Sequence, residues 1–208
     1  MAAHAVTHAG AGHHDGHDHH GPPEANRSSR VEPAFLGMLL FIISEVMIFG
    51  AFFTAYFFIR VVNGDPWPAE GDHLPKLIAG FNTAILISSS FTIHFAQEAI
   101  KKNNRLGLQL GMVLTWLLGA TFLFIQINEY VHIGFSPQDS AQGSIFYGLT
   151  GLHGAHVTIG LMLLSFVTIR AFRGHYSANA YHGMEVPGIY WHFVDVMWLV
   201  VYFTVYIL

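Results

Sequence analysis

Five long apolar runs constrain the fold of this chain more than any other feature of its sequence. They cover residues 34–62, 77–100, 106–131, 144–172 and 186–208. Each run reaches the roughly 20 residues that a helix needs to cross a bilayer, and lipid offers no hydrogen-bond partners to an open strand. Charged residues make up only 11% of the chain, well below the roughly 25% of soluble domains. Because the connections are short, the sequence predicts an all-α membrane protein with five transmembrane helices in an antiparallel bundle.

Small residues recur along the second to fourth runs and indicate where helices approach one another. Glycine and serine leave room for two helix backbones to come close, which favours helix–helix packing in membranes. The residues concerned are Ser88, Ser89, Ser90, Gly107, Gly111, Gly119, Gly148, Gly151 and Gly160. We interpret all of them as packing positions that carry no chemistry.

The first 33 residues differ in kind from the rest of the chain. They hold seven of the fifteen histidines, among Gly, Ala and Asp, and lack the basic start and apolar core of a signal peptide. Such a segment buries too little apolar surface to fold alone, although a His-rich tract has affinity for metals. We therefore predict a disordered His-rich tail at 1–33 and a five-helix transmembrane domain at 34–208. Metal binding by the tail is the alternative to a merely solvated segment.

The distribution of lysine and arginine predicts the orientation of the bundle. Seven of the nine basic residues lie before the first run, after the second, or at and just beyond the end of the fourth, which are all on one side of the membrane. Lysine and arginine are enriched in the short loops that lie on the cytoplasmic side of a membrane. The pattern predicts that the N-terminus lies inside and the C-terminus outside.

Composition also excludes several classes of function. The chain has no cysteine, so it has no disulfide, thiolate metal centre, iron–sulfur cluster or covalently attached c-type haem. Its net charge is −4 and it carries no basic patch, so a nucleic-acid partner is not expected.

One carboxyl residue, Glu45, lies deep in the first run. It follows the start of that run by about eleven residues, which places it near mid-depth on the inner side. An ionisable group inside the membrane is a functional candidate by default. The alternative is a carboxyl that is hydrogen-bonded to a neighbouring helix and serves only structure.

A second ionisable pair, His192 and Asp195, lies in the last run. The two residues are three apart, so they share one face of a helix. Inserting a charged group into the membrane costs about 2.5–3.5 kcal/mol on translocon scales. Two such residues in the last helix therefore indicate a structural or functional role that offsets this cost. The two interpretations are a direct functional role and a hydrogen bond that fixes the rotation of this helix against a neighbour.

A third set of polar residues lies toward the predicted outer ends of the second to fourth runs. Antiparallel packing would bring the pair Gln126 and Glu129 to the depth of the pair His153 and His156, with Asn82 on the outer side of the second run. Histidine and glutamate can bind zinc, copper or non-haem iron. No further strong ligand is evident at that depth, so a network that fixes the third helix to the fourth is favoured over a metal site.

Taken in order, the motifs of these runs resemble subunit III of a haem–copper terminal oxidase, of the cytochrome c oxidase or bacterial quinol oxidase kind. The resemblance covers about residues 34–208, and it is specific because the motifs occur in the family's order. The matching stretches are Ser44-Glu45-Val46-Met47-Ile48-Phe49, Asn82-Thr83 with Ser88-Ser89, Gln126-x-x-Glu129-Tyr130, Gly151-Leu152-His153-Gly154-Ala155-His156-Val157 and Tyr190-Trp191-His192-Phe193-Val194-Asp195-Val196-Met197-Trp198-Leu199. Longer members begin with two further helices around a lipid-holding cleft, so the chain looks like the five-helix bacterial form. Part of that lipid site is then absent or supplied by another chain.

The resemblance implies a non-catalytic subunit of an enzyme complex in the aerobic respiratory chain, in the plasma membrane of a bacterium. It implies that this chain binds no haem, copper or other metal, that haem and copper lie in partner subunits, and that phospholipid binds to the bundle. The partners implied are subunit I, which reduces O₂ to water and pumps protons, subunit II and a small subunit IV where one is present.

The resemblance also implies a role for each polar group. Glu45 becomes the buried carboxyl that supports proton uptake by subunit I, and His192 with Asp195 becomes an inner polar face. An outer polar network, for helix packing or lipid, would consist of Asn82, Gln126, Glu129, His153 and His156.

Two other functions are compatible with these residues. The first is the related accessory subunit found beside nitric oxide reductases, although the motifs look closer to the oxidases. The second is a small metal or proton transporter that loads through the His-rich tail and uses Glu45, His153, His156 and His192 as a relay. The short length and the lack of an internal repeat disfavour a transporter.

Overall fold

The computed structural model describes residues 33–63, 74–176 and 182–208. The tail predicted for residues 1–33 therefore lies, apart from Pro33, outside the described residues. The helices are α1 (Pro33–Asn63), α2 (Lys76–Lys101), α3 (Arg105–His132), α4 (Ala141–Phe172) and α5 (His182–Tyr202), and a short π-helical turn, η2 (Phe203–Ile207), continues α5. Each of the five α-helices is long and apolar enough to cross a membrane. The predicted all-α fold with five spans is thereby confirmed, whereas the orientation of the termini stays a prediction.

Two helices begin earlier than the sequence predicts. α4 begins at Ala141 and has 32 residues, so it is about 48 Å long at 1.5 Å per residue and its middle lies near His156. α5 begins at His182, so Pro187 lies inside the helix rather than in its first turn. Proline lacks the N–H that would bond four residues back, so the carbonyl of Gly183 receives no helical hydrogen bond from it.

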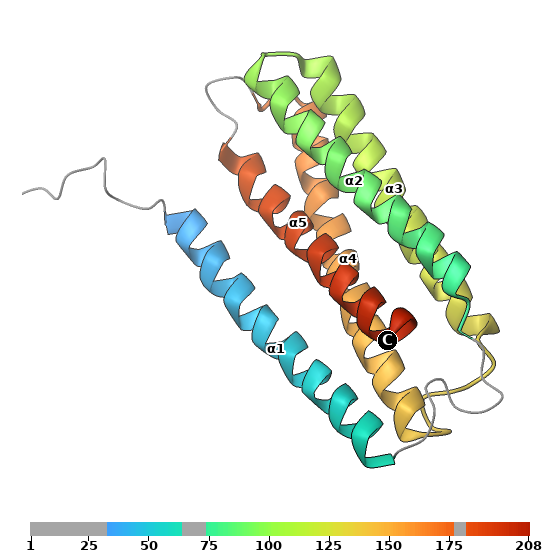
Figure 1. The fold of residues 1–208 in the computed structure, drawn as a ribbon. Coiled ribbons are helices and arrows are strands. Elements are labelled where there is room, and N and C mark those ends of the chain that lie inside the picture. The colour runs from blue at the N-terminus through green and yellow to red at the C-terminus, as the bar shows by residue number, and fades with distance from the viewer. Residues whose placement is uncertain (1–32, 64–73, 177–181) are drawn as a thin grey trace, which may run out of the picture. The chain divides into compact units, whose positions relative to one another are not determined.

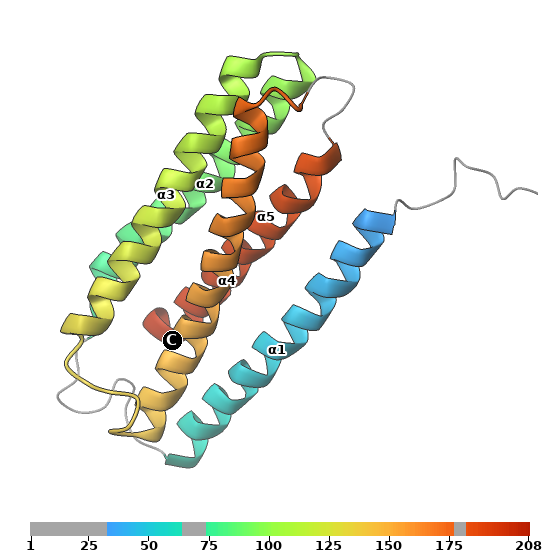
Figure 2. The same ribbon diagram turned by 180° about the vertical axis from the view of Figure 1, so that it is seen from behind.

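The helices are arranged with α4 and α5 in the middle of the bundle. Figures 1 and 2 show α1 along one edge and the α2–α3 pair along the opposite edge, with α4 and α5 between them. The contacts agree, because α1 packs against α4 and α5 while α2 packs most extensively against α3. Sequential helices run in opposite directions, as an antiparallel bundle requires.

A tight turn and small side chains bring α2 and α3 together. Asn103 adopts a positive φ of 56° in the turn, a conformation that asparagine tolerates better than most residues. Asn104 then caps α3, since its side chain accepts a hydrogen bond from the N–H of Gly107 at 3.0 Å. A Cβ added to Gly111 would lie 2.8 Å from the Cβ of Ala96, so the helices approach closely there.

The core is centred on Trp191, which is fully buried between four helices. Its indole ring from α5 lies against Gly119 of α3 and Gly160 of α4, and its Nε1 donates to Ser89 Oγ of α2 at 2.9 Å. The predicted packing role of these two glycines is confirmed. The prediction was wrong for Gly151, because a Cβ there would meet nothing within 4 Å.

α1 is the most exposed helix, and specific contacts hold it to the bundle. Apolar side chains on its outer face are largely uncovered, with Met47 71% exposed. Near its end, Tyr56 Oη donates to the carbonyl of Thr204 at 2.8 Å, and Arg60 Nη2 donates to the backbone oxygen of Leu208 at 2.5 Å. Phe52 packs its ring over Gly148 of α4. Burial alone gives α1 little attachment, so its polar contacts matter for its position.

Candidate functional site

The pair Glu45 and His156 joins α1 to α4 inside the membrane. Glu45 Oε2 lies 2.8 Å from His156 Nε2, and both side chains are largely buried. His156 Nδ1 lies 2.8 Å from the carbonyl oxygen of Leu152. A carbonyl only accepts, so Nδ1 carries a hydrogen and donates to Leu152. One further proton is then shared between Glu45 Oε2 and His156 Nε2, which makes this pair a proton-holding contact between two helices.

This contact corrects the depth that the sequence predicts for both residues. Glu45 was expected on the inner side and His156 near the outer end, but the two side chains touch and so lie at one level. Both residues lie near the middle of their helices, since Glu45 is three residues before the middle of α1 and His156 is at the middle of the 32-residue α4. His156 therefore bonds across to α1 and does not belong to an outer network with α3.

Ser90 of α2 lies between His192 and Asp195 of α5. Its Oγ lies 3.1 Å from His192 Nδ1 and donates to Asp195 Oδ2. Asp195 is 7% exposed, and no partner for its Oδ1 occurs among the described residues. His192 and Asp195 thus share one helix face, as their spacing predicts, and both reach the same hydroxyl on a neighbouring helix.

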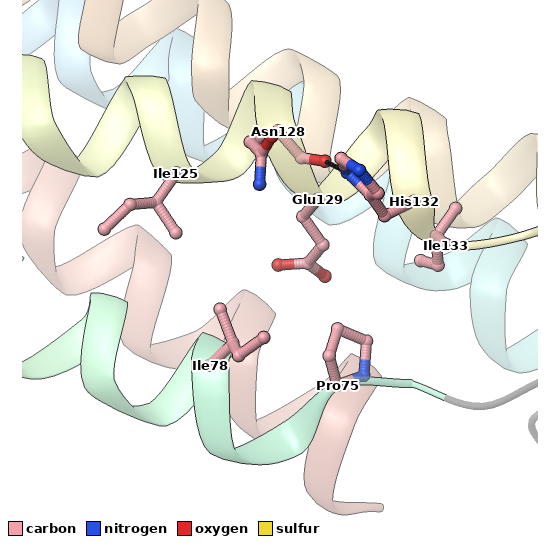
Figure 3. Close-up of a pocket in the computed structure, with 7 residues that line it drawn as sticks. All are labelled: Pro75, Ile78, Ile125, Asn128, Glu129, His132 and Ile133. Atoms are coloured by element: carbon pink, nitrogen blue, oxygen red, sulfur yellow. Dashed lines mark hydrogen bonds between the residues drawn. The ribbon is translucent and has the colours of Figure 1, made fainter.

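Glu129 lies at one end of the bundle and borders the pocket shown in Figure 3. Its Oε1 accepts a hydrogen bond from Tyr206 Oη of η2 at 2.6 Å. The pocket has a volume of about 310 Å³, and its walls are Pro75, Ile78, Ile125, Asn128, Glu129, His132 and Ile133. In Figure 3 the carboxylate of Glu129 extends from α3 into the space beside Ile78 and Pro75. Glu129 therefore ties α3 to the end of the chain rather than to α4.

The other three residues of the predicted outer set are buried in the core. Asn82 Nδ2 donates to the carbonyl of Phe122 at 3.1 Å, which joins α2 to α3. His153 is fully buried, with its ring 4.7 Å from that of Trp198 and 5.6 Å from that of Phe122 between centroids. The ring nitrogens of His153 have no hydrogen-bond partner within the described part of the chain, whereas the buried amide of Gln126 lies near the hydroxyls of Tyr130 and Tyr206.

The single network that was expected from Gln126, Glu129, His153 and His156 is therefore wrong. Glu129 bonds to η2 and His156 bonds to α1, so the two bonds lead to different elements. Hydrogen bonds join α3 to α4 at this end, from Tyr130 Oη to Thr150 Oγ1 at 2.8 Å and from Tyr147 Oη to the carbonyl of Tyr130 at 3.4 Å. Across residues 33–63, 74–176 and 182–208, no group of three or more His, Asp or Glu side chains is arranged to hold a metal ion.

Sequence reasoning missed Ser90 and Tyr206 as members of these sites. Ser90 was interpreted as a small packing residue, yet it is the hydroxyl that connects two ionisable side chains. A usable signal existed, because Ser90, His94 and Glu98 are spaced four apart and share one face of α2. Tyr206 carries no comparable signal, since its partner Glu129 is 77 residues away in the sequence.

Comparison with known proteins identifies the family. The family model described as cytochrome c oxidase subunit III matches residues 26–208, which include every helix and every site residue above. A cytochrome c oxidase subunit 3 from Thermostichus vulcanus is 42% identical over 174 residues, covering 83% of this chain and 86% of that protein. The Synechocystis protein of that name is 42% identical over 196 residues, covering 93% and 80%. The Drosophila yakuba protein is 40% identical over 176 residues, covering 82% and 67%. The resemblance seen in the sequence is thereby confirmed, and the chain belongs to the cytochrome c oxidase subunit III family.

Proposed function

We propose that this chain is the accessory, non-redox subunit III of a proton-pumping haem–copper terminal oxidase in an aerobic respiratory chain. In this role it stabilises subunit I, keeps proton uptake fast and holds lipid, in the plasma membrane of a bacterium with its N-terminus inside. The observation that carries the proposal is the family match over all five helices, together with relatives that are named as oxidase subunits.

The bonding of the histidines supports a non-redox role. Both ring nitrogens of His156 are engaged, one by Leu152 and one by Glu45. His192 directs its Nδ1 to Ser90, and the ring nitrogens of His153, unbonded within the described residues, are fully buried against the rings of Phe122 and Trp198. A haem or copper site needs several imidazole nitrogens gathered around the metal, and the described histidines are not gathered in this way. We therefore place the haem and copper in partner subunits.

The exposed face of α1 supports the proposed contact with lipid or with a partner chain. A helix with an apolar outer face packs favourably against acyl chains or against another transmembrane helix. The contacts of Glu45, Phe52, Tyr56 and Arg60 fix how this face is presented. Loss of the Glu45 contact would loosen α1 where it faces lipid or subunit I.

The test replaces Glu45 in the assembled complex. We expect Glu45→Ala to leave the initial rate of O₂ reduction in place, while proton uptake slows or the enzyme inactivates earlier during turnover. Glu45→Gln keeps a hydrogen-bonding side chain, so it should show a smaller effect. Ser44→Ala is the matched control, because the exposed Ser44 donates to the carbonyl of Phe41 in its own helix. Unchanged proton uptake and turnover lifetime in Glu45→Ala would contradict the proposed support of proton uptake.

A further inference from the structure

The hydroxyl of Ser90 connects an imidazole to a buried carboxyl group. A serine hydroxyl has one hydrogen to donate and lone pairs to accept. When Ser90 donates to Asp195 Oδ2, the contact with His192 Nδ1 must be a donation from that nitrogen to Ser90 Oγ. In the reverse arrangement a protonated Asp195 donates to Ser90, and Ser90 donates to an unprotonated His192 Nδ1. Both arrangements of the hydrogen atoms are compatible with the same positions of the oxygen and nitrogen atoms.

A stripe of polar residues leads from this cluster to the end of α2. Ser90, His94 and Glu98 lie one helical turn apart on one face of α2. His94 is exposed and lies within electrostatic range of His192. Glu98 is partly exposed and forms an ion pair with Lys101 at 2.7 Å, beside the α2–α3 turn. The titratable groups at this α2–α5 seam include Asp195, His192 and Glu185 on α5 and His94, Glu98 and Lys101 on α2, with Glu185 and Lys101 lining one small pocket at its end.

We propose that Asp195 is a proton-exchanging group, which takes up and releases a proton through Ser90 and His192, with His94 and Glu98 leading to the aqueous surface at the end of α2. This relay would be one part of the support of proton uptake proposed above, and its physiological role rests on that proposed function. It assigns a transfer role to the α2–α5 seam, separate from the Glu45 and His156 contact on α1 and α4.

The proton transfer balances within the three side chains. The O–H bond of the Asp195 carboxyl breaks and its proton bonds to Ser90 Oγ, while the former Ser90 proton bonds to His192 Nδ1. The products are a carboxylate at Asp195, an intact hydroxyl at Ser90 and an imidazolium at His192. His192 then releases a proton toward His94, and the reverse sequence reloads Asp195. No electron moves and no other reactant is required.

The competing explanation is that the same hydrogen bonds only fix the rotation of α5 against α2. The two explanations differ in how fast the Asp195 carboxyl exchanges its proton with solvent. If the hydrogen bonds are purely structural, the exchange of the Asp195 proton does not depend on Ser90. If Ser90 is part of a relay, removing its hydroxyl slows that exchange. Asp195 is itself almost fully buried, so exchange needs a path through the protein.

The experiment measures hydrogen–deuterium exchange of this carboxyl by infrared spectroscopy on the purified complex. The carboxyl band of Asp195 is assigned as the band that disappears in Asp195→Asn. We expect rapid deuterium exchange of that band in the unaltered complex and in Ser90→Thr, which keeps the hydroxyl. In Ser90→Ala the exchange should slow by about tenfold or more, because one hydrogen-bonded link is lost.

The matched control is Ser88→Ala, made two residues away on the same helix. Ser88 is exposed, and its Oγ donates to the carbonyl of Ala84 in its own helix. Exchange in Ser88→Ala should equal that of the unaltered complex. Equal exchange in Ser90→Ala would overturn the relay, and so would the absence of any Asp195 carboxyl band across the pH range in which the complex is stable. If Glu45→Ala leaves proton uptake unchanged but exchange still depends on Ser90, the proposed function fails and the relay stands.

Discussion

Replacing Gly119 with alanine should destabilise the bundle by forcing the Trp191 indole out of its position. A Cβ at residue 119 would lie 2.5 Å from Trp191 Cη2 and 3.1 Å from a methyl of Leu161. Ordinary carbon–carbon contacts are about 3.5–4.0 Å, so the ring would have to move by about 1 Å. The ring cannot retreat easily, because Gly160 lies against its other edge and its Nε1 is bonded to Ser89.

The size of this steric destabilisation can be isolated by comparing Gly119→Ala with the same substitution at a second glycine. Gly151 of α4 also lies within a helix, but a Cβ there would meet nothing within 4 Å. Both Gly→Ala changes gain the same helix propensity, about 1 kcal/mol, so their difference isolates the steric effect. Overpacking a well-packed core costs about 1–3 kcal/mol. We therefore expect Gly119→Ala to be less stable than Gly151→Ala by about that amount.

The assay is thermal dissociation of this chain from the detergent-purified complex, followed by native electrophoresis. For chains of this size, about 1 kcal/mol lowers the midpoint by about 2–4 °C, so the two variants should differ by several degrees. Adding Trp191→Phe to Gly119→Ala should recover part of the loss, because the smaller ring leaves room for the new methyl group. Equal midpoints for Gly119→Ala and Gly151→Ala would refute the reasoning.

Two further predictions concern buried polar groups. Tyr206→Phe removes the hydrogen bond to Glu129 Oε1 and should cost about 1–3 kcal/mol in the same assay; Tyr202→Phe, at a partly exposed position on α5, is the control and should cost little. Ordered water should be visible beside His153 in a high-resolution map, because its buried ring nitrogens have no partner among the residues that the structure describes. A well-resolved map with no water density beside that ring would contradict the second prediction.

The helical spans were predictable because apolarity is a property of each segment by itself. The five runs match the observed helices to within four residues at most ends, since the length and hydropathy of a span do not depend on its neighbours. The exception is the last run, where the α-helix ends at Tyr202 and a π-helical turn follows. The close packing at Gly111 and Gly119 was predictable for a related reason, as only small side chains let backbones approach.

The partners of the polar residues were not predictable, because they depend on helix rotation and length. Rotating a helix by one residue turns a side chain by about 100°, so a partner on a neighbouring helix cannot be read from the spacing along one helix. Glu45 could therefore be recognised as a candidate, but its bond to His156 could not. The same holds for Asp195, whose spacing from His192 was informative while the linking residue on α2 was not evident.

The most direct test of the account is to purify the tagged chain in mild detergent and determine which polypeptides accompany it and which of them carries haem. The account predicts a complex that reduces O₂, with a visible haem spectrum that stays with a larger partner subunit when this chain is removed. Recovery of the chain without any haem-bearing partner, with a nitric oxide reductase, or with haem or copper bound to its own residues would contradict it.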